Sequence, residues 1–242
     1  MPRDNFVSRI LLKRIKKIIT ISQGLKDFYV EKFNVIPDAI LVAHDGVDLK
    51  DFLITIDKDK EIKRLNLPTK KPIVMYLGRL DPWKGVQTLL EASKILNDIQ
   101  VVVVGEGSEL EIFRKEYPNV IFKGLLPYRD LAYNQRVADI LVIPNSGKSK
   151  VSSFYTSPLK VFAHMSSSVP VVVSDLPALR EVLDENNSIL VESDNPENLA
   201  EGIKKVLGDK NLAEKISQQA LIDVKKYTWE LRAKNILNFI WK

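Results

Sequence analysis

The stretch that decides the fold is residues 144–182, PNSGKSKVSSFYTSPLKVFAHMSSSVPVVVSDLPALREV. A polar loop leads into Ser157-Pro158, where serine suits the N-cap of a helix and proline suits its first position. Apolar residues then recur at helical spacing, and the compact apolar run Val169–Val173 indicates a buried strand. Loop, capped helix and buried strand follow each other as in a doubly wound α/β sheet. A helix that begins at a loop rich in Ser, Gly and Lys can also bind an anion.

Strands and helices alternate on both sides of this stretch. Val101–Val104 is a continuous β-branched run, which is typical of a strand buried on both faces of a parallel sheet. The alternation predicts an α/β fold with a mostly parallel sheet of about six strands and right-handed crossovers. The other strands are expected at Ile73–Leu77, Val120–Phe122, Ile140–Ile143 and Ile189–Val191, and the helices over 86–97, up to 117, and over 128–138, 196–207, 210–226 and 229–241.

The first third of the chain has a different pattern. An amphipathic helix is predicted over 4–16, followed by a short strand at 18–21, a helix capped by Ser22 and a strand at 40–43. We place a domain boundary where this pattern changes. The predicted parts are an amino-terminal segment over 1–36, a sheet domain over 37–226 and a carboxyl-terminal helix over 227–242.

The composition is that of an ordinary globular protein, with 45% hydrophobic and 28% charged residues. Because there is no cysteine, disulfides and thiolate chemistry are excluded, and a reducing cytoplasm is the expected location. Two histidines do not favour a histidine-based zinc site. The net charge of +5 fits a lysine-rich proteome or a phosphate-bearing partner. The basic residues are dispersed, so no nucleic-acid partner is expected.

Four loops follow predicted strands, at 78–85, 105–108, 124–127 and 145–157. In a parallel α/β sheet, ligands bind at this edge. Glycine after a strand can simply end the strand, but four such loops together with Arg79 and Lys84 favour a phosphate-bearing ligand, since a guanidinium fork and an ammonium suit a diphosphate. The glycines at 105 and 107 are only a fragment of a dinucleotide motif, so NAD is not expected.

Several segments, in this order, resemble the carboxyl-terminal donor-binding domain of retaining glycosyltransferases of the GT-B fold, family GT4 (glycosyl transferases group 1). The resemblance runs from about residue 17 to residue 242. Its strongest parts are SPLKVF at 157–162 and VPVVVSDLPALREVL at 169–183. The other parts are DGVD at 45–48, YLGRLDPWKGVQTLLEA at 76–92, VVVVGEGSE at 101–109, ADILVIP at 138–144 and YTWELRAKNIL at 227–237.

The resemblance implies a donor that is a UDP- or GDP-sugar. Arg79 and Lys84 would bind its diphosphate and stabilise the leaving group, so neither a metal nor a cofactor is implied. Gly105, Gly107 and the loop at 125–127 would contact the base, and the amides that open the helix after Ser157 would cap a phosphate. The further residues expected at the donor are Gly46, Gly78, Gly105, Gly107, Leu126, Ser157, Pro158, Leu159, Lys160, Ala163 and Glu181.

The sequence departs from the family pattern at three positions in the central stretch. The family has a glutamate that holds the nucleotide ribose where this chain has Ala163, and Tyr155 stands at the position of a second glutamate. Loss of a charge-assisted hydrogen bond would cost roughly 1.5–3 kcal/mol. His164 could reach the ribose, but the favoured interpretation is a polar residue on the solvent side of its helix. Ser168 replaces the usual glycine, which would strain the turn if the backbone there has positive φ.

The amino-terminal domain of a GT-B enzyme, which binds the acceptor, is expected to be mostly absent, with residues 1–36 as its remainder. Apolar faces of that segment and of the last helix predict a homodimer or a separate chain that supplies the acceptor domain. The basic stretch 13–17 is interpreted as a solvated helix end, with peripheral contact to anionic lipid at the inner face of the membrane as the alternative. The expected activity is sugar transfer in polysaccharide or glycolipid synthesis; the alternative is a non-catalytic nucleotide-sugar-binding subunit, or an inactive form that needs a partner.

Overall fold

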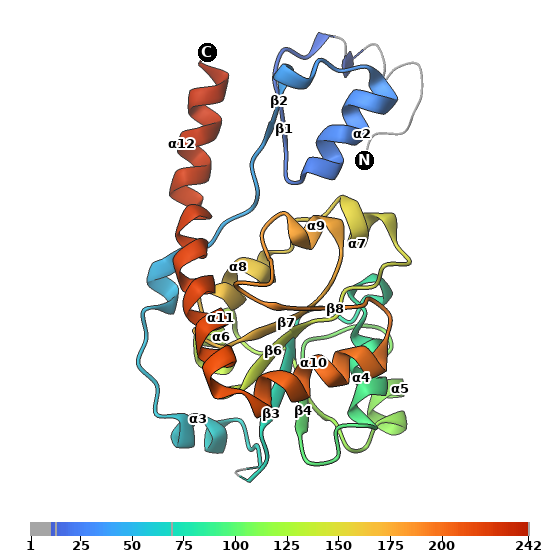
Figure 1. The fold of residues 1–242 in the computed structure, drawn as a ribbon, viewed down its shortest axis with the longest axis vertical. Coiled ribbons are helices and arrows are strands. Elements are labelled where there is room, and N and C mark those ends of the chain that lie inside the picture. The colour runs from blue at the N-terminus through green and yellow to red at the C-terminus, as the bar shows by residue number, and fades with distance from the viewer. Residues whose placement is uncertain (1–10, 13, 69, 242) are drawn as a thin grey trace.

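The computed structural model describes residues 11–12, 14–68 and 70–241 of the chain. Its centre is a sheet of six strands in the order β5-β4-β3-β6-β7-β8, in which every neighbouring pair is parallel (Figure 1). The predicted doubly wound α/β sheet is therefore confirmed. The strands are β3 (Ile73–Leu77), β4 (Gln100–Val104), β5 (Ile121–Gly124), β6 (Ile140–Ile143), β7 (Val171–Ser174) and β8 (Ile189–Val191).

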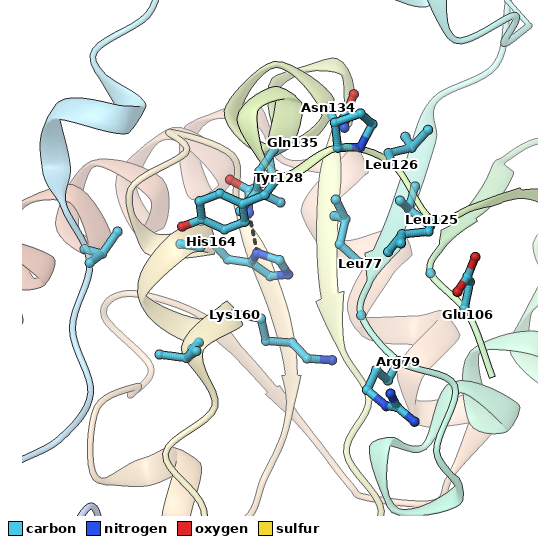
Figure 2. A pocket seen from close by; sticks show the side chains of 18 of the residues that line it. Leu77, Arg79, Glu106, Leu125, Leu126, Tyr128, Asn134, Gln135, Lys160 and His164 are labelled. Atoms are coloured by element: carbon cyan, nitrogen blue, oxygen red, sulfur yellow. Dashed lines mark hydrogen bonds between the residues drawn. The ribbon is translucent and has the colours of Figure 1, made fainter.

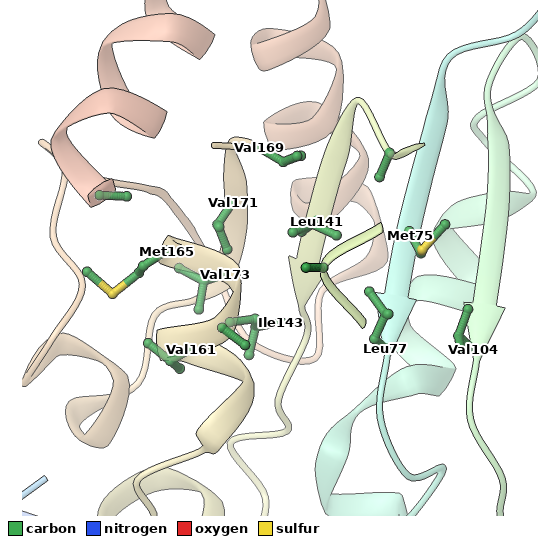
Figure 3. Packing of buried hydrophobic residues seen from close by; sticks show 14 of the residues in the cluster. Met75, Leu77, Val104, Leu141, Ile143, Val161, Met165, Val169, Val171 and Val173 are labelled. Carbon is green, nitrogen blue, oxygen red and sulfur yellow. The ribbon is translucent and has the colours of Figure 1, made fainter. Parts of the chain in front are cut away.

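Helices cover both faces of the sheet and bury its β-branched strands. One hydrophobic cluster joins the sheet to α4 (Val86–Ser93), α5 (Leu110–Glu116) and α10 (Pro196–Gly208). The cluster on the other face includes α6 (Leu131–Val137) and α8 (Leu159–Met165), as Figure 3 shows for the α8 side. The remaining α-helices of the sheet domain and beyond are α3 (Lys58–Arg64), α7 (Lys150–Phe154), α9 (Pro177–Arg180), α11 (Lys210–Asp223) and α12 (Trp229–Ile240).

The strand order reverses direction at β3. The chain proceeds from β3 to β4 and β5 on one side, then returns to β6, β7 and β8 on the other. At such a switch point the loops after adjacent strands run to opposite faces and leave a crevice at the carboxyl edge of the sheet.

Most element boundaries differ from the prediction by a few residues, and three of the differences are described here. The helix predicted over 86–97 ends at Ser93, where the side-chain amide of Asn119 donates to the Ser93 carbonyl. The strand predicted to begin at Val169 begins at Val171, because Pro170 has no N–H to donate to the ladder. Helix α8 begins at Leu159 rather than at the predicted Pro158.

The predicted N-cap role of Ser157 is wrong. Pro158 occupies the N-cap position of α8, and no side chain caps the helix there. The Ser157 hydroxyl instead accepts a hydrogen bond from the backbone N–H of Asp45, at 3.1 Å. Serine therefore ties the central stretch to a loop far away in the sequence.

The amino-terminal residues form a small separate layer. Strands β1 (Ile18–Thr20) and β2 (Ile40–Val42) pair in parallel, and α2 (Gln23–Phe33) lies between them in the chain. Ser22 caps α2 by accepting from the Leu25 N–H, as predicted. The predicted domain boundary at residue 36 falls between the two paired strands. Of the helix predicted over 4–16, residues 4–10 and 13 lie outside the described residues.

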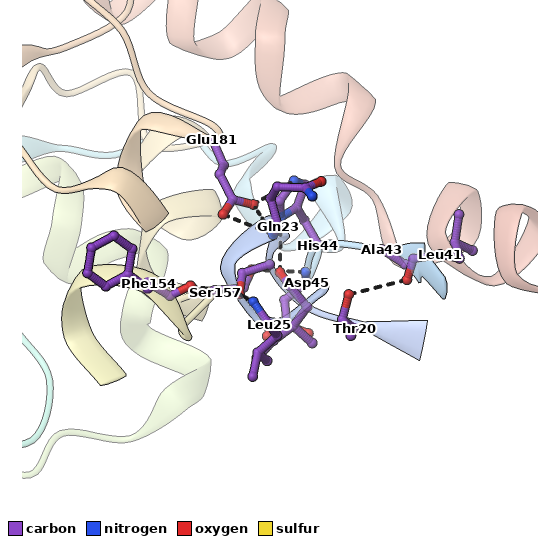
Figure 4. Close-up of polar contacts among 12 residues, drawn as sticks. Thr20, Gln23, Leu25, Leu41, Ala43, His44, Asp45, Phe154, Ser157 and Glu181 are labelled. Atoms are coloured by element: carbon purple, nitrogen blue, oxygen red, sulfur yellow. Dashed lines mark hydrogen bonds and ion pairs between the residues drawn. The ribbon is translucent and has the colours of Figure 1, made fainter. Parts of the chain in front are cut away.

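This amino-terminal layer is docked on the sheet domain by polar contacts (Figure 4). The Glu181 carboxylate accepts from the Gln23 N–H, at 2.8 and 3.0 Å, and the Ser22 hydroxyl donates to the Phe154 carbonyl. Helix α12 reaches the layer through Arg232, which donates to the Ala43 carbonyl. Among the described residues, no helix has both the length and the apolar composition needed to cross a bilayer.

Candidate functional site

A cavity of about 820 Å³ lies at the carboxyl ends of β3 and β4, at the switch point of the sheet (Figure 2). Its walls come from the loops after these strands, from α6 and α8, and from the first residue of α12. The residues that line it are Gly46, Val47, Leu77, Gly78, Arg79, Val104, Gly105, Glu106, Leu125, Leu126, Pro127, Tyr128, Leu131, Asn134, Gln135, Leu159, Lys160, Ala163, His164 and Trp229.

The structure brings most of the expected donor-binding residues together in this lining. They are Gly46, Gly78, Arg79, Gly105, Leu126, Leu159, Lys160 and Ala163. The other expected residues, Lys84, Gly107, Ser157, Pro158 and Glu181, do not line the cavity. Glu181 instead binds the start of α2 and approaches the His44 ring nitrogen to 3.5 Å, so it holds the amino-terminal layer in place.

The two glycines that directly follow β3 and β4, Gly78 and Gly105, differ in what a side chain at each position would contact. A Cβ on Gly105 would meet the backbone oxygen of Gly78 at 1.8 Å, so the packing of the two loops alone requires glycine there. A Cβ on Gly78 would meet the Lys160 Nζ at 3.2 Å and would therefore intrude on a cation of the cavity. Structural crowding explains Gly105, while Gly78 is open toward the site.

The two predicted diphosphate cations differ in environment. Arg79 is exposed and its Nε donates to the Asp81 carboxylate at 3.2 Å. Lys84 lies beside the cavity with its Nζ 3.7 Å from the centre of the Trp83 ring. Burial lowers the pKa of Lys84 to about 8, although the nearby Asp81 carboxylate acts in the opposite direction. A cation held in this way is partly desolvated before any ligand arrives.

Lys160 supplies a third cation. Its Nζ is buried and, among the described residues, has no hydrogen-bond partner, but it lies 4.2 Å from the centre of the Tyr76 ring. Burial, reinforced by the charge of Lys84, lowers the pKa of Lys160 well below its ordinary value. Tyr76 is fixed in turn because its hydroxyl donates to the Arg79 carbonyl at 2.6 Å. Lys160 is therefore linked to the loop that carries Arg79.

His164 is buried, so its predicted place on the solvent side of the helix is wrong. It is 1% exposed, and its Nδ1 lies 2.9 Å from the Nε2 of Gln135, which is also fully buried. Burial, together with the charge of Lys160, lowers the pKa of His164 to about 3, so the imidazole is neutral. The helix turns this side chain inward because α8 packs against α6 on the inner face, and Ala163 beside it lines the same wall.

The charge of the site suits an anionic ligand. Arg79 and Lys160 line the cavity and Lys84 lies close by, whereas Glu106 is the one carboxylate in the described lining. Within the described part of the chain, no group of three His, Asp or Glu side chains is placed to hold a metal ion. The expectation that phosphate charge is met by side-chain cations rather than by a metal stays a prediction.

Sequence reasoning did not identify Gln135 as a site residue. The available signal was position: Gln135 follows Ala132 by three residues, and His164 follows Val161 by three, so both polar residues continue the buried face of a helix. Polar residues on a buried face need partners. That pattern marks them as candidates, but their meeting across α6 and α8 depends on the tertiary fold.

Comparison with known proteins gives matches along most of the chain. A family model described as glycosyl transferases group 1 matches residues 57–222. An uncharacterised glycosyltransferase of Methanocaldococcus jannaschii is 28% identical over 92% of this chain and 59% of its own length. A D-inositol 3-phosphate glycosyltransferase of Xylanimonas cellulosilytica is 26% identical over 83% of this chain and 51% of its own length. The chain thus spans only between about half and three fifths of these relatives.

A solved structure extends the likeness to three dimensions. The crystal structure of HepE from Anabaena in complex with UDP-glucose matches with a TM-score of 0.82 at 19% identity, and the match covers 97% of this chain and 66% of that one. At this identity the likeness concerns the fold alone. The six-stranded sheet and its neighbours are those of the GT-B type, as the sequence predicted.

Proposed function

The chain belongs to the group 1 glycosyl transferases, and we propose that its cavity binds a UDP- or GDP-sugar as the donor for transfer with retention of configuration. The single observation that carries the proposal is the cavity at the switch point of the sheet, with Arg79 and Lys160 in its lining. Nucleotides bind at this place in doubly wound sheets. The UDP-glucose in the crystal structure of HepE, a protein of similar fold, supports the same class of ligand.

The proposed chemistry follows from the three cations. During transfer the bond between the anomeric carbon and the phosphate oxygen breaks, and the nucleoside diphosphate leaves with the electron pair. Arg79, Lys84 and Lys160 would bind the diphosphate and stabilise the negative charge that develops on the leaving oxygen. The oxygen of the acceptor hydroxyl then bonds to the anomeric carbon on the face that the leaving group occupied, and its proton passes to the leaving phosphate oxygen. This scheme requires neither a metal nor a cofactor.

The proposal also concerns the surroundings of the enzyme. We expect a cytoplasmic protein that acts in polysaccharide or glycolipid synthesis. Peripheral contact with the membrane would bring a lipid-linked acceptor to the cavity.

The test is a thermal-shift series with UDP, GDP, ADP, the corresponding sugar conjugates and NAD. A ligand at a hundred times its dissociation constant stabilises the folded state by about 2.7 kcal/mol. The proposal predicts a rise in Tm with UDP or GDP and none with NAD. If neither UDP nor GDP at millimolar concentration raises Tm, while the protein unfolds cooperatively, the proposal is contradicted.

The variant Ala163→Glu serves as a second arm. Ala163 lines the cavity at the position where the family has its ribose-binding glutamate, and the small side chain leaves room there. If the carboxylate is restored, the affinity for the nucleotide that binds should rise about tenfold to a hundredfold. The matched control is Ala178→Glu on α9, because Ala178 is also buried but does not line the cavity. An equal change in both variants would show a general effect of the buried charge.

A further inference from the structure

The geometry points to His164 and Gln135 as the pair that recognises the nucleoside of the donor, in place of the carboxylate that this chain lacks at Ala163. This inference rests on the proposed function, because it assigns a role within the same cavity. His164 comes from α8 and Gln135 from α6, and Figure 2 shows their hydrogen bond, which joins these two helices in the lining of the cavity.

Each member of the pair keeps one polar atom without a partner. Among the described residues, the Nε2 of His164 and the Oε1 of Gln135 are buried and make no hydrogen bond within the protein. Buried polar atoms are almost always paired, because an unpaired one loses its water without compensation. Both side chains belong to the lining of the cavity, which places the pair at its wall.

The pair offers one donor and one acceptor, whichever way its own hydrogen bond is arranged. If the Gln135 amide donates to Nδ1, the imidazole carries its proton on Nε2, and the free atoms are an N–H donor and a carbonyl acceptor. If the Gln135 amide is turned so that its oxygen accepts from the imidazole Nδ1–H, the free atoms are a ring nitrogen acceptor on His164 and the amide NH2 donor of Gln135. Burial keeps the pKa of His164 at about 3, so the neutral ring holds across the physiological range.

Two neighbouring buried polar side chains do not share this property. Asn134, beside Gln135 on α6, accepts from Arg64 at 2.5 Å, and Ser166, near the end of α8, donates to the Phe162 carbonyl at 2.8 Å. Arg136 on α6 also keeps its Nε unpaired, but its other guanidinium nitrogens donate to the Ile54 and Phe52 carbonyls and it does not line the cavity. On these two helices, Gln135, Lys160 and His164 are the described residues that both line the cavity and carry an unpaired buried atom.

A neighbouring donor and acceptor suit the nucleoside and do not suit the diphosphate. A phosphate has only acceptor oxygens and binds to Arg79, Lys84 and Lys160, whereas a ribose hydroxyl both donates and accepts. The edge of a nucleobase also carries a donor beside an acceptor. Because a neutral pair recognises the uncharged part of the ligand, it should act on the nucleoside and leave the affinity for pyrophosphate unchanged.

The experiment compares the wild type, the double variant Gln135→Leu/His164→Phe and the control Ser166→Ala. Isothermal titration would use UDP or GDP, as the wild type selects, the corresponding 2′-deoxynucleotide, and pyrophosphate. We expect the double variant to bind the nucleoside diphosphate about tenfold to a hundredfold more weakly, with pyrophosphate binding and Tm preserved or Tm raised. The control variant should match the wild type. The single variant Gln135→Met, which removes only one polar group, tests the same point if the double variant folds poorly.

The outcomes separate the two proposals. Wild-type protein that binds neither UDP nor GDP overturns the proposed function and this inference with it. Wild-type binding that the variants leave unchanged overturns only the role of the pair, and so does an equal loss for the nucleotide and for pyrophosphate. A preference for ribonucleotide over deoxynucleotide that disappears in the variants assigns the pair to the ribose, whereas an equal loss for both assigns it to the base.

Discussion

The pKa of Lys84 leads to a pH dependence that can be measured directly. In the free protein, burial lowers the pKa of Lys84 to about 8, so the amine loses its proton in a range where an ordinary lysine remains charged. A bound diphosphate favours the charged form and raises this pKa again. Binding should therefore take up a proton above pH 8, and affinity for UDP or GDP should fall as pH rises.

The size of the effect follows from the fraction of protonated Lys84. At pH 7 nearly every molecule is ready to bind, whereas at pH 9 about one in eleven is, so the dissociation constant should rise about tenfold between these values. The terminal phosphate is fully ionised above pH 7, since its pKa is about 6. Titration calorimetry at pH 7, 8 and 9 in two buffers of different ionisation enthalpy measures both the affinity and the proton uptake.

The matched control is Lys84→Arg, which keeps the charge but remains protonated throughout this range. It should bind with nearly constant affinity from pH 7 to 9 and take up no proton at this site. If the wild type shows no loss of affinity, or if the arginine variant shows the same loss, Lys84 is not the group that titrates. Lys160→Met then tells whether Lys160, whose pKa is also lowered, causes the remaining dependence.

Three further predictions concern strain, charge and docking. Ser168 is exposed and has φ +63°, so Ser168→Gly should relieve about 1–2 kcal/mol of backbone strain in the folded state. Part of this gain is offset because glycine makes the unfolded chain more flexible, so calorimetry should show a rise in Tm of about 1–4 °C; a lower Tm would contradict this. Lys160→Met should leave Tm equal or higher, because it removes an unpaired buried amine, while pyrophosphate affinity falls at least about tenfold; unchanged affinity would exclude a diphosphate contact. Glu181→Gln should cost about 1 kcal/mol at the start of α2 and speed hydrogen exchange over 18–42 but not in the sheet; uniform protection in both would refute a docking role.

The sequence predicted the sheet because its strands are buried on both faces. A run such as Val101–Val104 has few alternatives to a central parallel strand, and every predicted strand of the sheet is present within a few residues. The strained turn at Ser168 could also be anticipated, since the family places glycine there. The structure confirms it with a positive φ at Ser168. Both features can be predicted because they depend only on residues that are close in the sequence and on whether a strand is buried.

Two features of the site depended on distant contacts and could not be read from local patterns. Ser157 precedes a proline and a helix, as an N-cap does, yet its hydroxyl binds Asp45, 112 residues away. His164 follows Ala163 on a short helix, and only the position of α6 decides that its ring faces Gln135. Because the same residue types in the same order would fit a solvated helix, the buried place of the imidazole is a property of the tertiary structure.

The unpaired polar atoms suggest how stability and binding are related in this fold. In the described chain, buried side-chain atoms without partners occur at Gln135, Arg136, Asn145, Ser152, Lys160 and His164, and three of these residues, Gln135, Lys160 and His164, line the cavity. An unpaired buried group destabilises the free protein by about 1–3 kcal/mol, and a ligand that pairs with it regains this energy on binding. Substitutions that remove such a group should therefore move Tm and affinity in opposite directions. A group that serves only the fold would lower both, so the sign of the two changes, measured together, separates residues kept for the ligand from residues kept for the structure.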